Sequence, residues 1–324
     1  MNKVIAKAPG KCILFGEHSV VYGYPAIAIA IPIFSTCAVE EINEKVIELD
    51  LVNFIQKYKF KDLEELININ NRALSPIAKC LAIFKERYGV NISGLRISIA
   101  SDLIPGAGLG SSASIAASLT FAVGTYFGIK LSKKKVSKIA FKLEKITHGT
   151  PSGIDNNICT YGNLIYFKKG KVKSLKLPFN LNFLITYTNI KHNTKEAIKK
   201  VKEFINNNPK EAKIIMRTIG ALVKEVKLLF NLRMKNLSEI GSIMNENQKL
   251  LSKLGVSNDT IAEIIDIALD NGAYGAKLTG AGLGGCVITL GEHENLKKIK
   301  NILKNKGYES FYADICEKGV HLVE

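Results

Sequence analysis

Residues 95–126 join a strand pattern, a glycine-rich turn and a helix pattern in direct succession. Leu95, Ile97 and Ile99 alternate with polar or small residues, which predicts a half-buried strand. An alanine-rich apolar stretch over 112–126 predicts a helix, and the turn between the two reads PGAGLGSS from Pro105 to Ser112. Such a turn presents backbone N–H groups and the positive end of a helix dipole, so it predicts a phosphate-binding site.

The turn differs from the two familiar nucleotide-binding patterns. No lysine follows its last glycine, as a Walker A loop requires, and its glycines do not have the GxGxxG spacing. Ser111 and Ser112 add hydroxyls at the helix start, where one can cap the helix and the other can meet a metal ion or a phosphate. Close packing of a strand–helix turn is the alternative, but it needs neither three glycines nor paired serines.

A second glycine-rich segment runs from Lys277 to Gly285 and precedes an apolar strand over 286–290. Alone, this segment is also compatible with close backbone packing. Together with the first turn, it predicts a nucleotide phosphate or a substrate held between two lobes.

Three charged residues occupy unusual places in the pattern. Asp155 follows Pro-Ser-Gly at the start of a predicted short helix, where the dipole favours a carboxylate, although a helix cap explains it equally well. Glu144 belongs to a helix predicted over 133–146, where a solvated glutamate is the ordinary interpretation. Lys11 follows Pro-Gly inside an apolar strand, which is an odd place for a surface charge.

The length of 324 residues with 47% hydrophobic side chains supports two cores. We predict an α+β protein with lobes at 1–178 and 179–324, divided near Pro178-Phe179-Asn180. Breaks are expected at Pro9-Gly10 and between strands over 26–33 and 36–40, and residues 50–75 read as irregular. The second lobe is predicted to contain strands over 183–188, 286–290, 309–315 and 320–323 and helices over 193–206, 209–230, 234–252, 257–270 and 294–305.

The net charge of +16 raises the question of nucleic-acid binding. The lysines are spread along the chain and over helix faces, so we expect no nucleic-acid partner and a positive field that draws anionic substrates inward. The six cysteines stand singly, without metal-ligand spacing, which is typical of reduced thiols in a cytosolic protein. The sequence shows neither a signal peptide nor an apolar run of membrane-spanning length, so we expect a cytoplasmic protein without a membrane partner.

Three segments resemble, in order and spacing, the signature motifs of the GHMP small-molecule kinases. These segments are KAPGKCILFGEHSVVYG over 7–23, PGAGLGSSAS over 105–114 and KLTGAGLGGC over 277–286. The stretches GEHSVVYG over 16–23 and HGTPSGIDN over 148–156 look most like the archaeal mevalonate kinase branch, whereas a galactokinase usually has Gly-Glu-His-Thr-Asp-Tyr near its start. The resemblance covers almost the whole chain.

The resemblance implies a fold, substrates and site residues. It implies an N-terminal mixed α/β lobe, a ferredoxin-like C-terminal lobe, the substrates ATP and mevalonate, and Mg²⁺ as cofactor. It makes Asp155 and Lys11 catalytic and Ser112 and Glu144 metal ligands. The implied ATP-binding residues are Pro105, Gly106, Ala107, Gly108, Leu109, Gly110, Ser111, Ser112, Ala113 and Ser114. The implied substrate-binding residues are Glu17, His18, Lys11, Asp155, Gly280, Ala281 and Gly282.

Some alternatives stay open at this point. A related GHMP kinase for phosphomevalonate or another alcohol shares the motifs, because substrate choice depends on pocket shape. A lyase like mevalonate diphosphate decarboxylase usually lacks both the lysine at the place of Lys11 and the HGxPSGxD motif. A non-catalytic nucleotide-binding protein has no need to keep Lys11, Glu144 and Asp155 together. Oligomeric state is also open, with a homodimer as one option.

Overall fold

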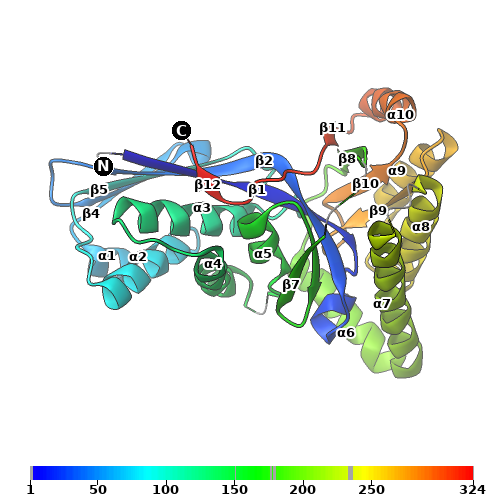
Figure 1. Ribbon diagram of the computed structural model, residues 1–324, viewed down its shortest axis with the longest axis horizontal. Coiled ribbons are helices and arrows are strands. Elements are labelled where there is room, and N and C mark those ends of the chain that lie inside the picture. The colour runs from blue at the N-terminus through cyan, green and yellow to red at the C-terminus, as the bar shows by residue number, and fades with distance from the viewer. Residues whose placement is uncertain (1–2, 150, 176, 178–179, 233–235, 324) are drawn as a thin grey trace.

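A computed structural model describes residues 3–149, 151–175, 177, 180–232 and 236–323. The chain forms two lobes, each built on its own sheet (Figure 1). The predicted α+β class with two lobes is confirmed. The predicted boundary falls on Pro178 and Phe179, which lie outside the described residues, so the division at that point stays a prediction.

The first lobe is an eight-stranded mixed sheet in the order β12-β1-β2-β5-β3-β4, with β6 paired to β2 and β7 to β6. Among the described residues, the β3–β5 pairing is parallel and the other pairings of this sheet are antiparallel. Helices α1 to α5 cover one face of this sheet (Figure 1). The strands are β1 Lys3–Phe15, β2 Ala26–Glu41, β3 Ile47–Leu51, β4 Gln56–Phe60, β5 Leu95–Ser101, β6 Leu164–Lys168, β7 Lys171–Leu175 and β12 His321–Leu322, and the helices are α1 Leu63–Asn68, α2 Ser75–Tyr88, α3 Ser111–Tyr126, α4 Lys133–His148 and α5 Ile154–Tyr161.

Two expectations for this lobe were wrong. β1 and β2 are single long strands that continue through the expected breaks, and the ladder between them absorbs Pro9-Gly10 as a register shift. Residues 50–75 are not irregular, because they hold the end of β3, all of β4 and helix α1. That helix buries Leu63 and Leu66. It is capped by Asp62, whose side chain accepts a hydrogen bond from the Glu65 N–H at 3.0 Å.

The second lobe is a four-stranded antiparallel sheet in the order β11-β8-β10-β9. The chain order of strand, helices, two strands, helix and strand, with this strand order, is the ferredoxin-like arrangement, as predicted. The final strand was expected here but pairs with β1, so the C-terminus returns to the first sheet beside the N-terminus (Figure 1). The elements are β8 Phe183–Tyr187, α6 Thr194–Asn207, α7 Pro209–Asn231, α8 Leu237–Lys253, α9 Asp259–Asp270, β9 Gly275–Thr279, β10 Cys286–Leu290, α10 His293–Asn305 and β11 Ser310–Ala313.

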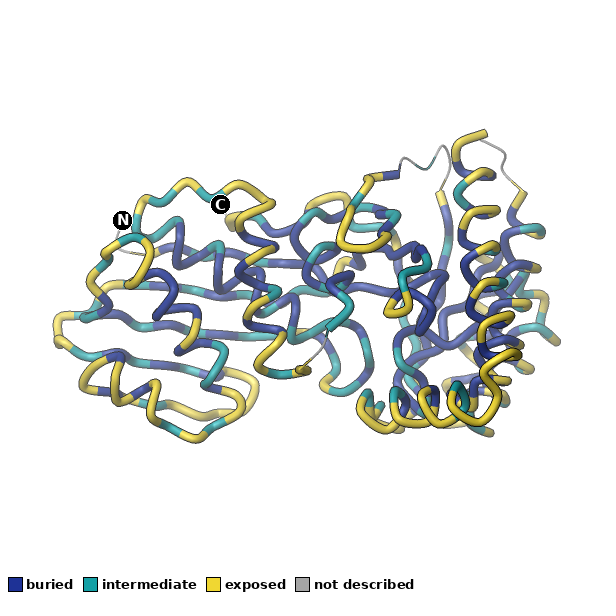
Figure 2. Tube along the Cα trace, turned by 90° about the horizontal axis from the view of Figure 1, so that it is seen from below, coloured by how far each residue is buried: buried dark blue, intermediate teal, exposed yellow. Residues whose placement is uncertain are grey.

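A shared apolar core fixes the two lobes against each other. Leu14 and Phe15 of β1 belong to the same buried cluster as Val223 of α7 and Ile288 of β10. Burial therefore continues from one lobe into the other, while exposed residues gather at the outer loops and helix faces (Figure 2). Among the described residues, no helix has the length and apolar character that crossing a membrane requires.

Candidate active site

The first glycine-rich turn joins β5 to α3. Gly106, Gly108 and Gly110 all have left-handed φ angles, of 76°, 78° and 80°. This backbone is costly for residues with a side chain, so the three glycines are needed for the shape of the turn. The helix begins at Ser111 with Gly110 as its N-cap and without a side-chain cap, which leaves its first N–H groups available to an anion.

Lys11 lies against this turn from β1. Its N–H donates to the Leu109 carbonyl at 2.8 Å. A Cβ atom on residue 110 would come within 2.7 Å of Lys11 Cγ, so Gly110 also makes room for the lysine stem. Lys11 is only 3% exposed. The apolar strand around Lys11 made a surface position unusual, and the structure shows that Lys11 is a buried cation beside the first glycine-rich turn.

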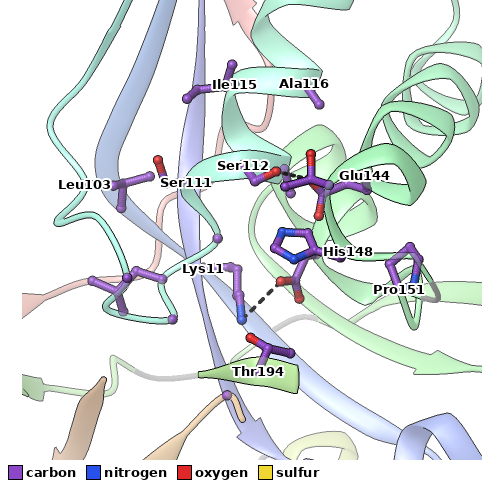
Figure 3. A pocket seen from close by; sticks show the side chains of 18 of the residues that line it. Lys11, Leu103, Ser111, Ser112, Ile115, Ala116, Glu144, His148, Pro151 and Thr194 are labelled. Atoms are coloured by element: carbon purple, nitrogen blue, oxygen red, sulfur yellow. Dashed lines mark hydrogen bonds and ion pairs between the residues drawn. The ribbon is translucent and has the colours of Figure 1, made fainter. Parts of the chain in front are cut away.

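Asp155 supplies the counter-ion of Lys11. Its Oδ2 atom lies 3.3 Å from Lys11 Nζ (Figure 3). Burial lowers the pKa of Lys11, but the charge and hydrogen bond of Asp155 more than offset that effect, and the pKa lies above its ordinary value. The side chain of Asp155 is 33% exposed, so it still faces the solvent-filled site. The cap of α5 is Gly153 without a side-chain cap bond, which argues against a capping role for Asp155.

Ser112 and Glu144 form a second polar pair in the same place. The Ser112 hydroxyl donates to Glu144 Oε1 (Figure 3). Glu144 is 4% exposed, unlike the solvated glutamate of an ordinary helix face. Burial raises the pKa of Glu144 to about 7, although the Ser112 hydrogen bond opposes the rise. Because burial disfavours the ionised form of Glu144, a cation bound beside it would stabilise that ionised form.

The oxygen atoms of this pair fit Mg²⁺. The described residues contain no group of three or more His, Cys, Asp or Glu side chains that could hold a metal. Magnesium commonly uses one or two protein oxygen ligands and completes its shell with water and substrate phosphates. A buried carboxylate and a hydroxyl at the start of the phosphate-type helix match that donor set.

The second glycine-rich segment is shorter than predicted. Gly275–Thr279 is strand β9, fully buried and paired with β10, so the turn itself covers only 280–285. His18 reaches this turn from the first lobe, with its Nε2 atom 2.9 Å from the Ala281 carbonyl oxygen. Glu17 pairs with Lys277 of β9, and both side chains are 0% exposed. The predicted substrate-side residues therefore connect the two lobes.

These elements surround one cavity of about 1130 Å³. Most of the predicted site residues line it: Lys11, Glu17, His18, Pro105, Gly106, Gly108, Leu109, Gly110, Ser111, Ser112, Ala113, Glu144, Asp155, Gly280 and Ala281. Ala107, Ser114 and Gly282 do not appear in the lining. Ala107 is fully buried, and the Ser114 hydroxyl donates to the Ala8 carbonyl at 2.6 Å. Gly282 lies against Val256, whose carbonyl oxygen would be 2.2 Å from an added Cβ.

The sequence reasoning missed five basic residues that line the cavity: Arg72, His148, Lys191, His192 and Lys195. Arg72 donates to the Thr147 carbonyl at 2.9 Å. The His192 N–H donates to the Gly106 carbonyl at 2.9 Å, so this residue buttresses the first turn. Burial lowers the pKa of both histidines, opposed at His148 by Asp155 and reinforced at His192 by Lys11. His148 stands inside the HGTPSGIDN segment, which is the signal that could have marked it, whereas His192 lies in the segment between β8 and α6 without a motif of its own.

Comparison with known proteins agrees with this geometry. Residues 75–163 match the GHMP kinases N terminal domain, and residues 221–309 match the GHMP kinases C terminal domain. The mevalonate kinase of Pyrococcus furiosus is 34% identical over 337 residues, which cover 99% of each chain. The crystal structure of the Methanococcus jannaschii mevalonate kinase has a TM-score of 0.84 at 32% identity, over 96% of this chain and 98% of that one. The L. major mevalonate kinase in complex with R-mevalonate has a TM-score of 0.80 at 26% identity, over 97% and 96%.

A chain that matches both GHMP domains and folds into their two lobes around a lysine–aspartate pair is an ATP-dependent kinase of the GHMP class. Within that class the identity extends over nearly the full length of archaeal relatives. The chain belongs to the mevalonate kinase family.

Proposed function

We propose that the protein transfers the γ-phosphoryl group of ATP to the 5-hydroxyl of mevalonate, giving 5-phosphomevalonate and ADP for isoprenoid synthesis. The observation that carries this proposal is the Lys11–Asp155 ion pair, which stands in a cavity between the two glycine-rich turns. A buried cation and a partly exposed carboxylate at that point suit transfer to an alcohol. The full-length similarity to mevalonate kinases selects the acceptor.

The ATP phosphates lie over the turn from Pro105 to Ser114 in this proposal. The N-terminus of α3 is free of a side-chain cap and supplies N–H donors there. The adenine ring lies toward Leu51, Asn53 and Phe54, which line the same cavity. Phe54 is 62% exposed, so its ring is available for stacking on a base.

Ser112 and Glu144 would hold Mg²⁺, which would supply charge neutralisation at the transferring phosphates. Asp155 orients the alcohol and accepts its proton as the new oxygen–phosphorus bond forms and the bond to the ADP oxygen breaks. Lys11 stabilises the negative charge that develops on the oxygens in flight. The ion pair supports this division of roles, because Lys11 and Asp155 contact each other and can therefore meet the same reacting oxygen.

The acceptor end of the site is formed by Glu17, His18 and the turn at Gly280-Ala281. Their place in the cavity lining supports this assignment. A cytoplasmic location is part of the proposal and is supported by six free thiols, of which five are buried. The expected homodimer stays a prediction.

The test is a substrate screen with purified protein and Mg-ATP, in which ADP release is measured against mevalonate, phosphomevalonate, homoserine and galactose. We expect the highest kcat/KM with mevalonate. A clear preference for homoserine or galactose would contradict the proposal, and a preference for phosphomevalonate would move the enzyme to another step with the same site.

A further inference from the structure

The pair formed by Glu17 and Lys277 is the most deeply buried ion pair among the described residues. Lys277 Nζ donates to Glu17 Oε1 and also to the Leu278 carbonyl oxygen, the latter at 2.6 Å. The second carboxylate oxygen of Glu17 is buried and has no hydrogen-bond partner. Removing two charges from water is costly, and a hydrophobic pair of similar size often gives equal or better stability. Fold stability alone therefore gives little reason for the pair.

The strand geometry explains why Lys277 reaches the first lobe. Lys277 and Thr279 are two residues apart on β9 and so share a face of the sheet. The Thr279 hydroxyl accepts a hydrogen bond from the Ile13 N–H at 2.9 Å and donates to the Ile13 carbonyl at 3.0 Å. These bonds fasten β9 to the end of β1, so Lys277 meets Glu17 just beyond that strand.

Glu17 also lies within the field of Lys11. Burial raises the pKa of Glu17, and the charges of Lys277 and, more weakly, Lys11 oppose that rise. Asp155, Lys11, Glu17 and Lys277 therefore form a series of alternating charge, buried except at Asp155, with two ion pairs at its ends. If the last cation were missing, the remaining cation near Glu17 would be Lys11, and Glu17 would compete with Asp155 for it.

We propose that Lys277 is a positioning residue for phosphoryl transfer: it holds the Glu17 carboxylate, so that Lys11 pairs with Asp155 and faces the reacting oxygens. The inference rests on the proposed function only for the roles of Lys11 and Asp155. Lys277 itself does not line the cavity, and it acts through Glu17. It thereby makes the chemistry in the first lobe depend on a strand of the second.

A pH-dependent defect follows for Lys277→Met. Without the lysine, the buried Glu17 keeps its proton to higher pH, and the protonated form does not compete for Lys11. Above the pKa of Glu17 the ionised carboxylate draws Lys11 away from Asp155. The other titratable groups near Glu17 are Cys12 and His18, and burial raises the pKa of the Cys12 thiol to about 12 and lowers the pKa of His18. Neither provides a substitute cation above neutral pH.

The experiment compares kcat for wild type, Lys277→Met, Lys277→Arg and the double variant Glu17→Gln/Lys277→Met. It runs from about pH 5.5 to about pH 8.5, to follow a carboxyl whose pKa is raised by burial above its ordinary value. Ile288→Ala is the matched control, because Ile288 is buried, faces Lys277 across the β9–β10 ladder and carries no charge. The thermal midpoint is measured for each protein over the same range.

For Lys277→Met, we expect kcat relative to wild type to fall by about tenfold or more as pH rises. A tenfold change is what the ionisation of one group, here Glu17, gives at about one pH unit above its pKa. The ratio stays flat for the double variant, for Lys277→Arg, which keeps the cation, and for Ile288→Ala. The thermal midpoint of Lys277→Met should also fall relative to the double variant as pH rises through the raised pKa of Glu17, because ionising a buried, unpaired carboxylate destabilises the fold.

A kcat ratio for Lys277→Met that does not change with pH would overturn the proposal, as would the same pH-dependent loss in Lys277→Arg. The thermal measurement needs no turnover, and it reports on Glu17 whichever alcohol the enzyme prefers. A wild-type protein that rejects mevalonate but shows the pH-dependent midpoint difference between the single and double variants would refute the proposed substrate and leave the Glu17–Lys277 linkage standing.

Discussion

Replacing Asp155 by Asn gives the sharpest test of the proposed chemistry. The substitution keeps the size of the side chain and one hydrogen-bond acceptor for Lys11, but it removes the charge and the basic oxygen. We expect kcat to fall by at least about a hundredfold, the lower end of what a positioned proton acceptor contributes. That loss corresponds to about 2.7 kcal/mol of transition-state stabilisation.

The cost to folding should be smaller. Lys11 is 3% exposed and would lose its counter-ion, but the Asp155 side chain is 33% exposed, so water already screens the pair. We therefore expect a loss of about 1–3 kcal/mol in the free energy of unfolding, below the cost of breaking a fully buried pair. Loss of a helix cap adds nothing, because Gly153 occupies the cap of α5.

The assay measures kcat, the KM for each substrate and the thermal midpoint on one preparation. The KM for ATP should change little, because the nucleotide is held mainly by the first glycine-rich turn. Glu263→Gln is the control, since Glu263 forms an exposed ion pair with Lys306 at 2.6 Å and does not line the cavity. Near-normal turnover in Asp155→Asn would remove this carboxylate from the mechanism.

The other substitutions test the metal pair and the first turn. Glu144→Gln should raise the Mg²⁺ concentration needed for half-maximal rate by about tenfold or more, and Ser112→Ala should do so less strongly, in a magnesium titration at fixed ATP. The pKa of Glu144 is raised from 4.5 to about 7, so ionising it costs stability in the metal-free protein. Glu144→Gln should therefore raise the free energy of unfolding of that protein by about 3 kcal/mol above about pH 7. Urea unfolding should show this gain disappearing as pH falls to about 4.5. Gly110→Ala should lower kcat by about tenfold or more because its Cβ displaces Lys11, whereas Gly170→Ala, with a similar φ of 74° and open space, carries only the backbone cost of about 1–2 kcal/mol. Equal kinetics in the two alanine variants would contradict the packing argument.

Local patterns in the sequence were sufficient for the longer helices, though not for the short α1, and for the turns that hold the site. The helix predicted over 209–230, for example, agrees to within one residue with α7, Pro209–Asn231. The first turn was recognisable because glycines with left-handed φ, a preceding strand and a following helix are all determined by neighbours in the chain. Asp155 was placed correctly at the start of α5 for the same reason.

Contacts between distant residues were not predictable in this way. Glu17 and Lys277 are 260 positions apart, and nothing near either residue indicates that both side chains are buried. Glu144 lies on a helix with an ordinary amphipathic pattern, yet it is buried and its hydrogen-bond partner, Ser112, stands 32 residues earlier. Strand β12 was assigned to the wrong sheet because pairing partners of a short terminal strand are set by the tertiary fold.

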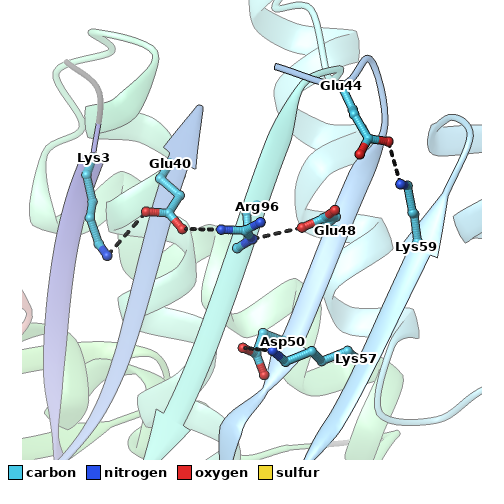
Figure 4. A network of polar contacts seen from close by, with 8 residues as sticks. All are labelled: Lys3, Glu40, Glu44, Glu48, Asp50, Lys57, Lys59 and Arg96. Atoms are coloured by element: carbon cyan, nitrogen blue, oxygen red, sulfur yellow. Dashed lines mark hydrogen bonds and ion pairs between the residues drawn. The ribbon is translucent and has the colours of Figure 1, made fainter. Parts of the chain in front are cut away.

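The position of Lys11 shows how one irregularity in a strand creates the site. Lys3 belongs to the charged network on the open face of the sheet, with Glu40, Arg96 and Glu48 (Figure 4). In a regular strand Lys11 would share that face with Lys3, because the two are separated by an even number of residues. The alternation reverses across the register shift between Pro9 and Gly10, because Ala6 and Ala8 belong to the core under the helices before the shift and Ile13 belongs to it after the shift. Lys11 therefore points toward Asp155 of α5. Pro9 and Gly10, which were expected to end a strand, instead mark the irregularity in β1 that places Lys11 on the buried face.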